Sequence, residues 1–272
     1  MTEVCVVKKL ELGLQIHCVR DAFMEDPETT LQQVAAMGYD GVEMVLQYCP
    51  FEPERYRKAL KETGLACYSM MLDWKYFASE PDMERTIELA RAMDCPVIIM
   101  AAVPKPTLEE VSNNPTLARE LADTARNVAK RLQDAGFETG YHDHDRDHMV
   151  FVDGKESFMD YLLRNTDDDY IYMIDTGNAM AGGADPIEKV RKFPHRSPIV
   201  HLKGFAAETR YLTPMWKSEI DTDELVKTLV NEGGAEVISI EFGFAADGGD
   251  PFDQCARSYT WLRDKLTTNG LL

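Results

Sequence analysis

The sequence lacks the features by which proteins bind membranes and nucleic acids. None of its apolar runs approaches the roughly 18–20 residues that cross a membrane, and the first residues, MTEVCVVKKLELG, hold no apolar stretch long enough for a secretory signal. It has no basic cluster, and its formal net charge of −18 repels nucleic-acid phosphates and anionic lipid surfaces. We therefore expect neither a membrane nor a nucleic acid as partner.

The sequence also has few cysteines, and they are scattered. The six cysteines include no Cys-x-x-Cys pair, so in a chain of 272 residues they do not indicate a disulfide framework. Scattered cysteines are typical of reduced, buried thiols, and they predict a cytoplasmic protein. Hydrophobic residues make up 44% and charged residues 28% of the chain, as in an ordinary globular domain.

A glycine-rich turn is missing after the first predicted strand, where the sequence reads QIHCVRDAF. Such a turn is typical of an open, doubly wound sheet. Short β-rich runs alternate with helical runs along the chain, and several are almost continuously apolar, as in parallel strands covered on both faces. Eight such units predict an α/β fold with a single domain over residues 1–272, a (β/α)8 TIM barrel.

Capping residues and apolar spacing give the boundaries of the predicted elements. Three of the predicted helices, 26–38, 185–192 and 250–266, open with Asp-Pro, an N-cap followed by proline at the first helical position. Two more are predicted at 83–94 and 115–136 from apolar residues at helical spacing. The strands are predicted at 12–18, 40–45, 65–71, 95–102, 137–144, 170–176, 198–204 and 236–244.

Polar residues stand at the C-terminal ends of the last four predicted strands, where TIM barrels carry their active sites. The fifth strand ends in His142 and His144, which share one face because they are two residues apart. The next three strands carry Asp175, His201 and Glu241 at equivalent heights. A carboxylate within the apolar run VISIEFGF would be costly to bury without a cation. Imidazole and carboxylate groups together predict a divalent metal site, for Mn, Co, Zn or Fe, with Mg as a further candidate.

The segment GYHDHDRDHMVF concentrates three of the six histidines of the chain. Its alternation predicts that His142 and His144 face the site and that Asp143 points to the opposite face of the strand. Residues 145–148 are predicted to form a solvated loop.

These motifs, in this order, resemble the xylose-isomerase-like TIM barrels, a family described broadly as sugar phosphate isomerases and epimerases. The resemblance covers nearly the whole chain. It implies one divalent metal ion, with Mn²⁺ as the first candidate, held by His142, Asp175, His201 and Glu241. The motifs that carry it are LGLQIHCVRDAF, GYDGVEMV, GYHDHDRDHMVF, MIDTGNAMAGGADPIE, IVHLKG and ISIEFGF.

The chain departs from the family pattern at three of these positions. Many members have Glu where His142 stands, so His144 is a competing ligand from the same strand. The motif of the seventh strand usually ends in Asp, and here it ends in Gly204. Asn178 stands where the sixth-strand motif often has His, and we assign it to substrate binding.

The resemblance implies an isomerase or epimerase that removes a proton next to the carbonyl of a keto- or aldo-sugar. The predicted acid/base groups are Glu241 together with His142 or His144, and Lys203 is predicted to bind a substrate oxygen. Two alternatives stay open. One is a lyase or dehydratase that uses the same enolate on a keto-sugar, an inosose or a keto-glycoside, and the other is a non-catalytic sugar-binding subunit.

Further residues near the strand ends are candidates for contacts with the sugar. His17, Arg20 and Glu43 are predicted to bind hydroxyl groups at the mouth of the barrel, with salt bridges of the rim as the alternative reading. Trp74 is predicted to stack on a sugar face, with packing under its loop as the alternative. Asp247 and Asp250 flank the glycines after the last strand and would repel a phosphate, so a non-phosphorylated sugar is expected. A homo-oligomer is possible.

Overall fold

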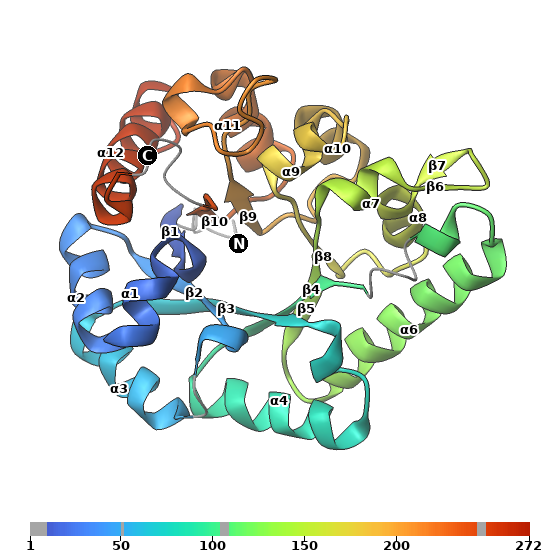
Figure 1. The fold of residues 1–272 in the computed structure, drawn as a ribbon, viewed down its shortest axis with the longest axis horizontal. Helices are drawn as coiled ribbons and strands as arrows, with labels where there is room; N and C mark the ends of the chain where they lie inside the picture. The colour runs from blue at the N-terminus through green and yellow to red at the C-terminus, as the bar shows by residue number, and fades with distance from the viewer. Residues whose placement is uncertain (1–9, 50–51, 104–108, 244–248) are drawn as a thin grey trace, which may run out of the picture.

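The computed structural model describes residues 10–49, 52–103, 109–243 and 249–272. Eight parallel strands form one sheet in the order β8-β5-β4-β3-β2-β1-β10-β9. This arrangement confirms the predicted (β/α)8 barrel (Figure 1). The strands are β1 (Glu11–Gln15), β2 (Gly41–Val45), β3 (Ala66–Asp73), β4 (Val97–Ala102), β5 (Glu138–His142), β8 (Ile171–Met173), β9 (Ile199–Leu202) and β10 (Val237–Ile240).

Helices surround the strands on the outside of the barrel (Figure 1). The α-helices are α1 (Arg20–Glu25), α2 (Pro27–Met37), α3 (Pro53–Thr63), α4 (Glu80–Ala92), α6 (Pro115–Asp134), α7 (Asp145–Met149), α8 (Phe158–Arg164), α9 (Thr176–Ala181), α10 (Pro186–Lys192), α11 (Thr222–Asn231) and α12 (Pro251–Thr268). Short 3-10 helices follow at η1 (Ile16–Val19), η2 (Leu46–Tyr48), η3 (Trp74–Tyr76) and η4 (Met215–Lys217). A hairpin of β6 (Phe151–Val152) and β7 (Glu156–Ser157) projects beside α7 (Figure 1).

Caps confirm the predicted starts of the three Asp-Pro helices, whereas the helix predicted from residue 83 begins at Glu80 after the N-cap Ser79. The carboxylate of Asp26 accepts a hydrogen bond from the backbone N–H of Thr29 at 3.0 Å, and α2 begins at Pro27. Asp185 and Asp250 cap α10 and α12 in the same way, each followed by proline. The first strand and the last four end earlier than predicted, so several of the candidate residues stand just beyond a strand and not within it, whereas β2 and β4 end where predicted and β3 ends two residues later.

The interior is apolar because the strands are covered on both faces. All residues of β2, β9 and β10 are buried, as their almost continuous apolar runs predict. Gly140 allows β5 and β8 to approach closely, since a Cβ atom there would lie 2.0 Å from the carbonyl oxygen of Ile171.

The two ends of the sheet, β8 and β9, meet where the barrel closes. In the described part of the chain they are joined by an isolated parallel bridge between Asp175 and His201 and not by a regular ladder. The backbone N–H of His201 donates to the carbonyl oxygen of Ile174 at 2.8 Å. Two residues of the predicted metal site therefore lie on the line of closure.

The predicted solvated loop at 145–148 is wrong. These residues form most of α7, and Asp147 and His148 are buried. The side chain of Asp147 accepts a hydrogen bond from the backbone N–H of His144 at 2.8 Å, which starts the helix. The ring of His148 lies 2.6 Å from the carboxylate of Asp143, so charged residues that suggested solvent are paired internally.

Two expectations from composition can be compared with the fold. Among the described residues no helix is both long enough and apolar enough to cross a membrane. The five cysteines within the described ranges are free thiols. Cys5 lies outside those ranges.

Candidate metal centre and active site

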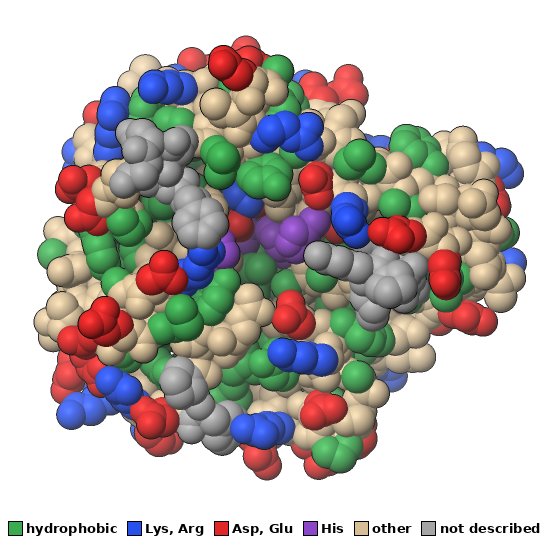
Figure 2. All heavy atoms as spheres, viewed as in Figure 1, with side chains coloured by type: hydrophobic (Ala, Val, Ile, Leu, Met, Phe, Trp, Pro, Cys, Tyr) green, Lys and Arg blue, Asp and Glu red, His purple; other side chains and the backbone are tan. Residues whose placement is uncertain are grey.

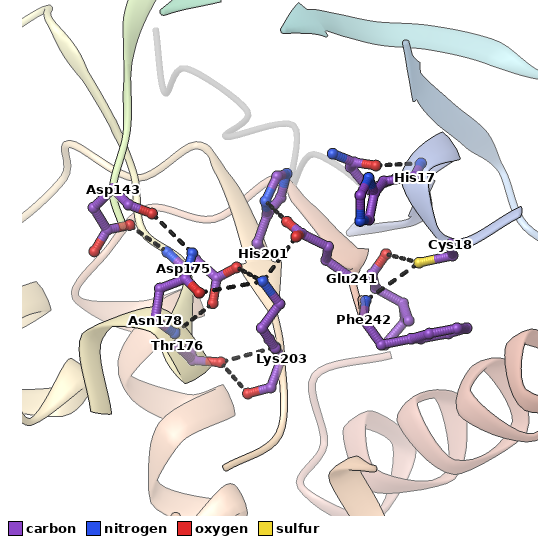
Figure 3. Close-up of polar contacts among 12 residues, drawn as sticks. His17, Cys18, Asp143, Asp175, Thr176, Asn178, His201, Lys203, Glu241 and Phe242 are labelled. Carbon is purple, nitrogen blue, oxygen red and sulfur yellow. Dashed lines mark hydrogen bonds and ion pairs between the residues drawn. The ribbon is translucent and has the colours of Figure 1, made fainter. Parts of the chain in front are cut away.

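Four side chains converge at the C-terminal ends of four neighbouring strands. His142 ends β5, Asp175 follows β8 as the N-cap of α9, His201 belongs to β9 and Glu241 follows β10. All four are buried, and one potential ligand atom from each lies within 4.8 Å of the others. Asp175, His201 and Glu241 can be seen pointing toward one another in Figure 3. The structure therefore brings together the four predicted ligands, with His142 and not His144 from the fifth strand.

The four potential ligand atoms fit a divalent cation. Each of the four is shielded from solvent and makes no hydrogen bond within the described residues. Oδ2 of Asp175 is paired with the ammonium of Lys203 at 2.7 Å, and Nδ1 of His201 lies 2.5 Å from Oε2 of Glu241. Two imidazole nitrogens and two carboxylate oxygens at one buried place provide the donor set of a divalent metal site. These atoms are Nδ1 of His142, Oδ2 of Asp175, Nδ1 of His201 and Oε2 of Glu241.

Burial and neighbouring charges shift the pKa values of three of these groups in different directions. Burial, together with His201 and His144, holds the pKa of His142 well below its usual range, so its ring is neutral and can offer a lone pair. Burial raises the pKa of Asp175 to about 7, even though Lys203 favours its ionised form. Burial opposes ionisation of Glu241, but Lys203 and His201 outweigh it and hold the pKa of that carboxyl well below its usual range.

Lys203 occupies the space between the two carboxylates. Its Nζ lies 2.7 Å from Oδ2 of Asp175, 2.7 Å from Oε1 of Glu241 and 3.3 Å from Oδ1 of Asn178 (Figure 3). Burial favours the neutral amine, but the two carboxylates outweigh it and raise the pKa of Lys203, so it is an ammonium group. Asn178 also donates to the backbone carbonyl of Asp143 at 3.0 Å. Both residues stand at the predicted place, engaged with protein groups.

Glu43 lies deeper than predicted. The sequence placed it at the mouth of the barrel, whereas its side chain is 0% exposed. Its Oε1 lies 2.9 Å from Nε2 of His201, and the hydroxyl of Ser69 donates to its Oε2 at 2.6 Å. Burial alone would lower the pKa of His201, and the carboxylates of Glu43 and Glu241 instead raise that pKa well above its usual range.

A cavity of about 450 Å³ opens over the converging side chains. Its lining includes four of the candidate residues, His17, His142, His144 and Glu241, and histidine side chains are visible in the central hollow of this face (Figure 2). A larger cavity of about 610 Å³, beside Trp216 and Arg257, contains none of the candidate residues, so volume alone does not locate the site.

The geometry can be compared with known proteins at this point. Residues 31–265 match the sequence profile of a family described as xylose isomerase-like TIM barrel. The chain belongs to this family.

Two relatives of this xylose isomerase-like chain are named inosose dehydratase. Inosose dehydratase of Clostridium botulinum is 25% identical over 196 residues, covering 66% of this chain and 64% of the relative. Inosose dehydratase of Geobacillus kaustophilus is 25% identical over 209 residues, covering 70% and 64%. The match thus spans a little under two thirds of the length of these relatives.

Solved structures share the fold at low identity. A sugar phosphate isomerase/epimerase from Parabacteroides distasonis superposes with a TM-score of 0.77 at 17% identity, covering 95% of each chain. A probable 3-DHS dehydratase from Bacillus anthracis gives 0.74 at 14% identity, covering 93% of this chain and 99% of the other. An L-ribulose 3-epimerase gives 0.70 at 15% identity, covering 96% and 95%. Sugar-modifying enzymes of more than one reaction class are therefore similar to this chain.

One departure from the xylose isomerase-like pattern has a steric explanation. A Cβ atom on Gly204 would lie 2.2 Å from the carbonyl oxygen of Thr213 and 2.9 Å from the carbonyl carbon of Pro214. The segment after β9 therefore occupies the space in which the more usual aspartate side chain would begin. Backbone atoms therefore exclude an acidic side chain at that position.

Of the other residues predicted to contact a sugar, His17 lines the cavity, and Arg20 and Trp74 do not. His17 lines the cavity, although it lies in η1 and not in a strand, and its Nδ1 is 2.6 Å from the hydroxyl of Tyr48. Arg20 places Nη1 2.8 Å from Nε2 of His17. Trp74 lies in η3, half-buried against the hydrophobic core and outside the cavity lining. The structure brings His17 and Arg20 to the mouth and does not bring Trp74 there.

Other cavity residues escaped the sequence analysis. Gln15, Tyr48 and Tyr141 line the cavity with Asp145 and Asp147. The motif QIHCVRD marks Gln15, whose side chain accepts a hydrogen bond from the backbone N–H of His17. Tyr48 follows a strand in a 3-10 turn and carried no sequence signal.

Asp143 was expected to face away from the site, and its carboxylate instead accepts hydrogen bonds from groups that support the site. Its Oδ1 accepts a hydrogen bond from the backbone N–H of Asp175 at 2.6 Å, and its Oδ2 accepts one from the hydroxyl of Tyr172 at 3.2 Å. The Nε2 of His148 lies 2.6 Å from the same Oδ2. This fully buried carboxylate thereby links the end of β5 to the metal-site residue Asp175.

Replacing Asp143 by asparagine is expected to destabilise the protein by about 2–4 kcal/mol, because an amide NH₂ must face a donor in either orientation of the side chain. Urea unfolding measures the change. Asp153→Asn, at an exposed turn, is the matched control and should change stability by less than about 0.5 kcal/mol. Equal stabilities of the two variants would show that the contacts of Asp143 contribute nothing net.

Proposed function

We propose that this chain is a metal-dependent enzyme that dehydrates a neutral polyhydroxy ketone. It would remove the proton next to the carbonyl and expel a hydroxyl from the adjacent carbon. The observation that carries the proposal is the convergence of His142, Asp175, His201 and Glu241, four buried side chains with ligand atoms within 4.8 Å of one another, at a cavity that His144 also lines. A divalent metal bound by these atoms would supply Lewis acidity to polarise the carbonyl group of the substrate.

His144 is the residue best suited to carry the proton. It lines the cavity, and its Nδ1 has no hydrogen-bond partner among the described residues. Burial and the Lys203 ammonium lower the pKa of His144, so the ring is neutral and able to accept a proton. The hydrogen bond from its backbone N–H to Asp147 fixes its place at the start of α7. The imidazole takes the C–H proton and returns it to the departing hydroxyl, which leaves as water.

Glu241 is a less suitable partner for a reversible epimerisation. An epimerase needs two groups that each accept and return a proton at one carbon. Lys203 and His201 hold the carboxylate of Glu241 ionised, so it is a poor donor to carbon. A dehydration tolerates this asymmetry because one base can serve both steps. The names of the inosose dehydratase relatives support the same choice.

The charge of the site supports a neutral substrate. Asp175, Glu241 and Glu43 contribute three negative charges when ionised, and Lys203 contributes one positive charge. A divalent cation would bring this buried group to net zero, and an anionic substrate would disturb the balance. The predicted repulsion of phosphate by Asp247 falls on residues 244–248, outside the described ranges, while Asp250 caps α12.

Products formed from neutral ketoses and inososes in D₂O test the proposal. The protein, loaded with Mn²⁺ or Co²⁺, is incubated with each compound and the mixtures are read by mass spectrometry and NMR. We expect the loss of one water from at least one inosose or keto-sugar. No water loss and no deuterium uptake with any compound and either metal would contradict the proposal.

Isomerisation or epimerisation is the second candidate, favoured by the structural likeness to the L-ribulose 3-epimerase. It would appear in the same experiment as deuterium uptake at carbon with a new diastereomer and no loss of water. That result would retain the proton abstraction next to the carbonyl, and return of a proton to carbon would replace the loss of the hydroxyl.

A further inference from the structure

Glu43 is a buried carboxylate that the proposed reaction leaves without a role. It belongs to β2, whereas the four converging residues come from β5 to β10. Its partner His201 is 158 residues away in the sequence. His201 lies in β9, the strand that meets β8 where the barrel closes. A fully buried carboxylate is costly unless it is paired and hydrogen-bonded, and Glu43 meets that condition through His201 and Ser69.

The sheet is irregular at the point where Glu43 is presented. The pairing of β2 with β3 matches Val42 to Cys67 and then Glu43 to Ser69, so Tyr68 is passed over. Such an irregularity re-aims side chains and is frequent beside active sites. It sets the hydroxyl of Ser69 opposite Glu43, where the hydroxyl donates to Oε2 at 2.6 Å. One oxygen of the carboxylate is thereby occupied, and the other faces His201.

The contact with Glu43 distinguishes the two nitrogens of His201. Nε2 lies 2.9 Å from Oε1 of Glu43, in hydrogen-bond geometry, and a carboxylate can only accept, so Nε2 carries the proton. Nδ1 makes no hydrogen bond within the described residues and lies 2.5 Å from Oε2 of Glu241, so it is the nitrogen that faces another of the converging residues. A histidine arranged in this way offers its Nδ1 lone pair to a metal.

We propose that Glu43, itself supported by Ser69, is a positioning residue that makes His201 an Nδ1 ligand and strengthens divalent metal binding. The carboxylate fixes the orientation and tautomer of the ring and increases the basicity of the coordinating nitrogen. It also supplies the third negative charge that balances the cation and Lys203. The inference rests on the metal site of the proposed function, and it does not depend on which reaction that site performs.

Titration of the metal-free protein with Co²⁺, followed by the visible absorption of the bound ion, tests this role without a sugar. Glu43→Gln keeps the shape of the side chain and removes its charge, and we expect it to weaken Co²⁺ binding about 10- to 100-fold. Ser69→Ala should weaken binding by a smaller factor, roughly threefold. Glu88→Gln, on the exposed face of α4, is the matched control and should bind like the wild type.

The wild-type protein provides a second measurement in case Glu43→Gln does not fold. In the Zn²⁺-loaded protein with ¹⁵N-labelled histidine, His201 should show a protonated, slowly exchanging Nε2 and a metal-shifted Nδ1. Coordination through Nε2, or equal affinities of Glu43→Gln and Glu88→Gln, would overturn the inference. A wild type that binds Co²⁺ but changes no keto-sugar would sink the proposed reaction and leave the role of Glu43 intact.

Discussion

Replacing His201 by alanine is expected to remove the metal from the protein. The wild type, purified and reconstituted, should hold about one divalent ion per chain, and the variant should hold none above background. His201 supplies one of the four convergent ligand atoms, and its loss also leaves Glu43 buried with Ser69 as its remaining hydrogen-bond partner in the described residues. Elemental analysis of both proteins measures the change directly, together with the identity of the ion.

The variant must be shown to be folded, because an unpaired buried carboxylate costs about 3–5 kcal/mol. Circular dichroism and thermal unfolding provide that check, and Asp175→Asn offers a second way to remove a ligand charge. His195→Asn is the control, since His195 is an exposed histidine whose backbone has φ 60°, a conformation that asparagine accepts. An unchanged metal content in folded His201→Ala would place the metal elsewhere in the chain.

Replacing His144 by glutamine is expected to reduce turnover about 10²- to 10⁴-fold, the usual contribution of a general acid–base group. Glutamine retains a polar side chain of similar reach but cannot accept and return a proton at neutral pH. His144 is not among the four convergent ligands, so the metal content should stay at the wild-type level. Turnover is measured as water loss from the best substrate of the ketose and inosose panel.

Deuterium exchange separates the proton transfer from substrate binding. In D₂O the His144→Gln protein should incorporate solvent deuterium next to the carbonyl as slowly as it forms product. If turnover and exchange both stay within about threefold of the wild type, His144 does not carry the proton. Glu241 and His142 would then remain among the predicted acid/base groups, and Glu241→Gln would be the next variant to measure.

The barrel and the four convergent ligands could be predicted because their signals are local. Each parallel strand is a short apolar run between amphipathic helices, and a TIM barrel brings the C-terminal ends of all its strands to one face. A polar residue at the end of such a run, such as His142, Asp175 or Glu241, is therefore placed by topology alone. The His-x-His spacing could not decide which histidine joins the group, since both lie on the same face of the strand.

The missed features depend on contacts between distant segments. The depth of Glu43 follows from the register shift between β2 and β3 and from the reach to His201, neither of which leaves a pattern in the sequence. The helix at 145–149 was missed because its charged residues suggest solvent, whereas Asp147 and His148 are paired with groups from the same buried cluster. A run of charged residues indicates a solvent-exposed segment only when the folded protein offers those residues no buried partner.

The bridge between Asp175 and His201 has a consequence for the lifetime of the protein. Elsewhere neighbouring strands pair in ladders, two of them with a register shift, and at this seam Asp175 and His201 face each other across an isolated bridge. A cation bound to both would act as a clasp, and without it β9 would be the first strand to part from its neighbour. Metal starvation would then expose β8 and β9 to proteases, so the supply of the ion would govern how much of the protein persists as well as how fast it works.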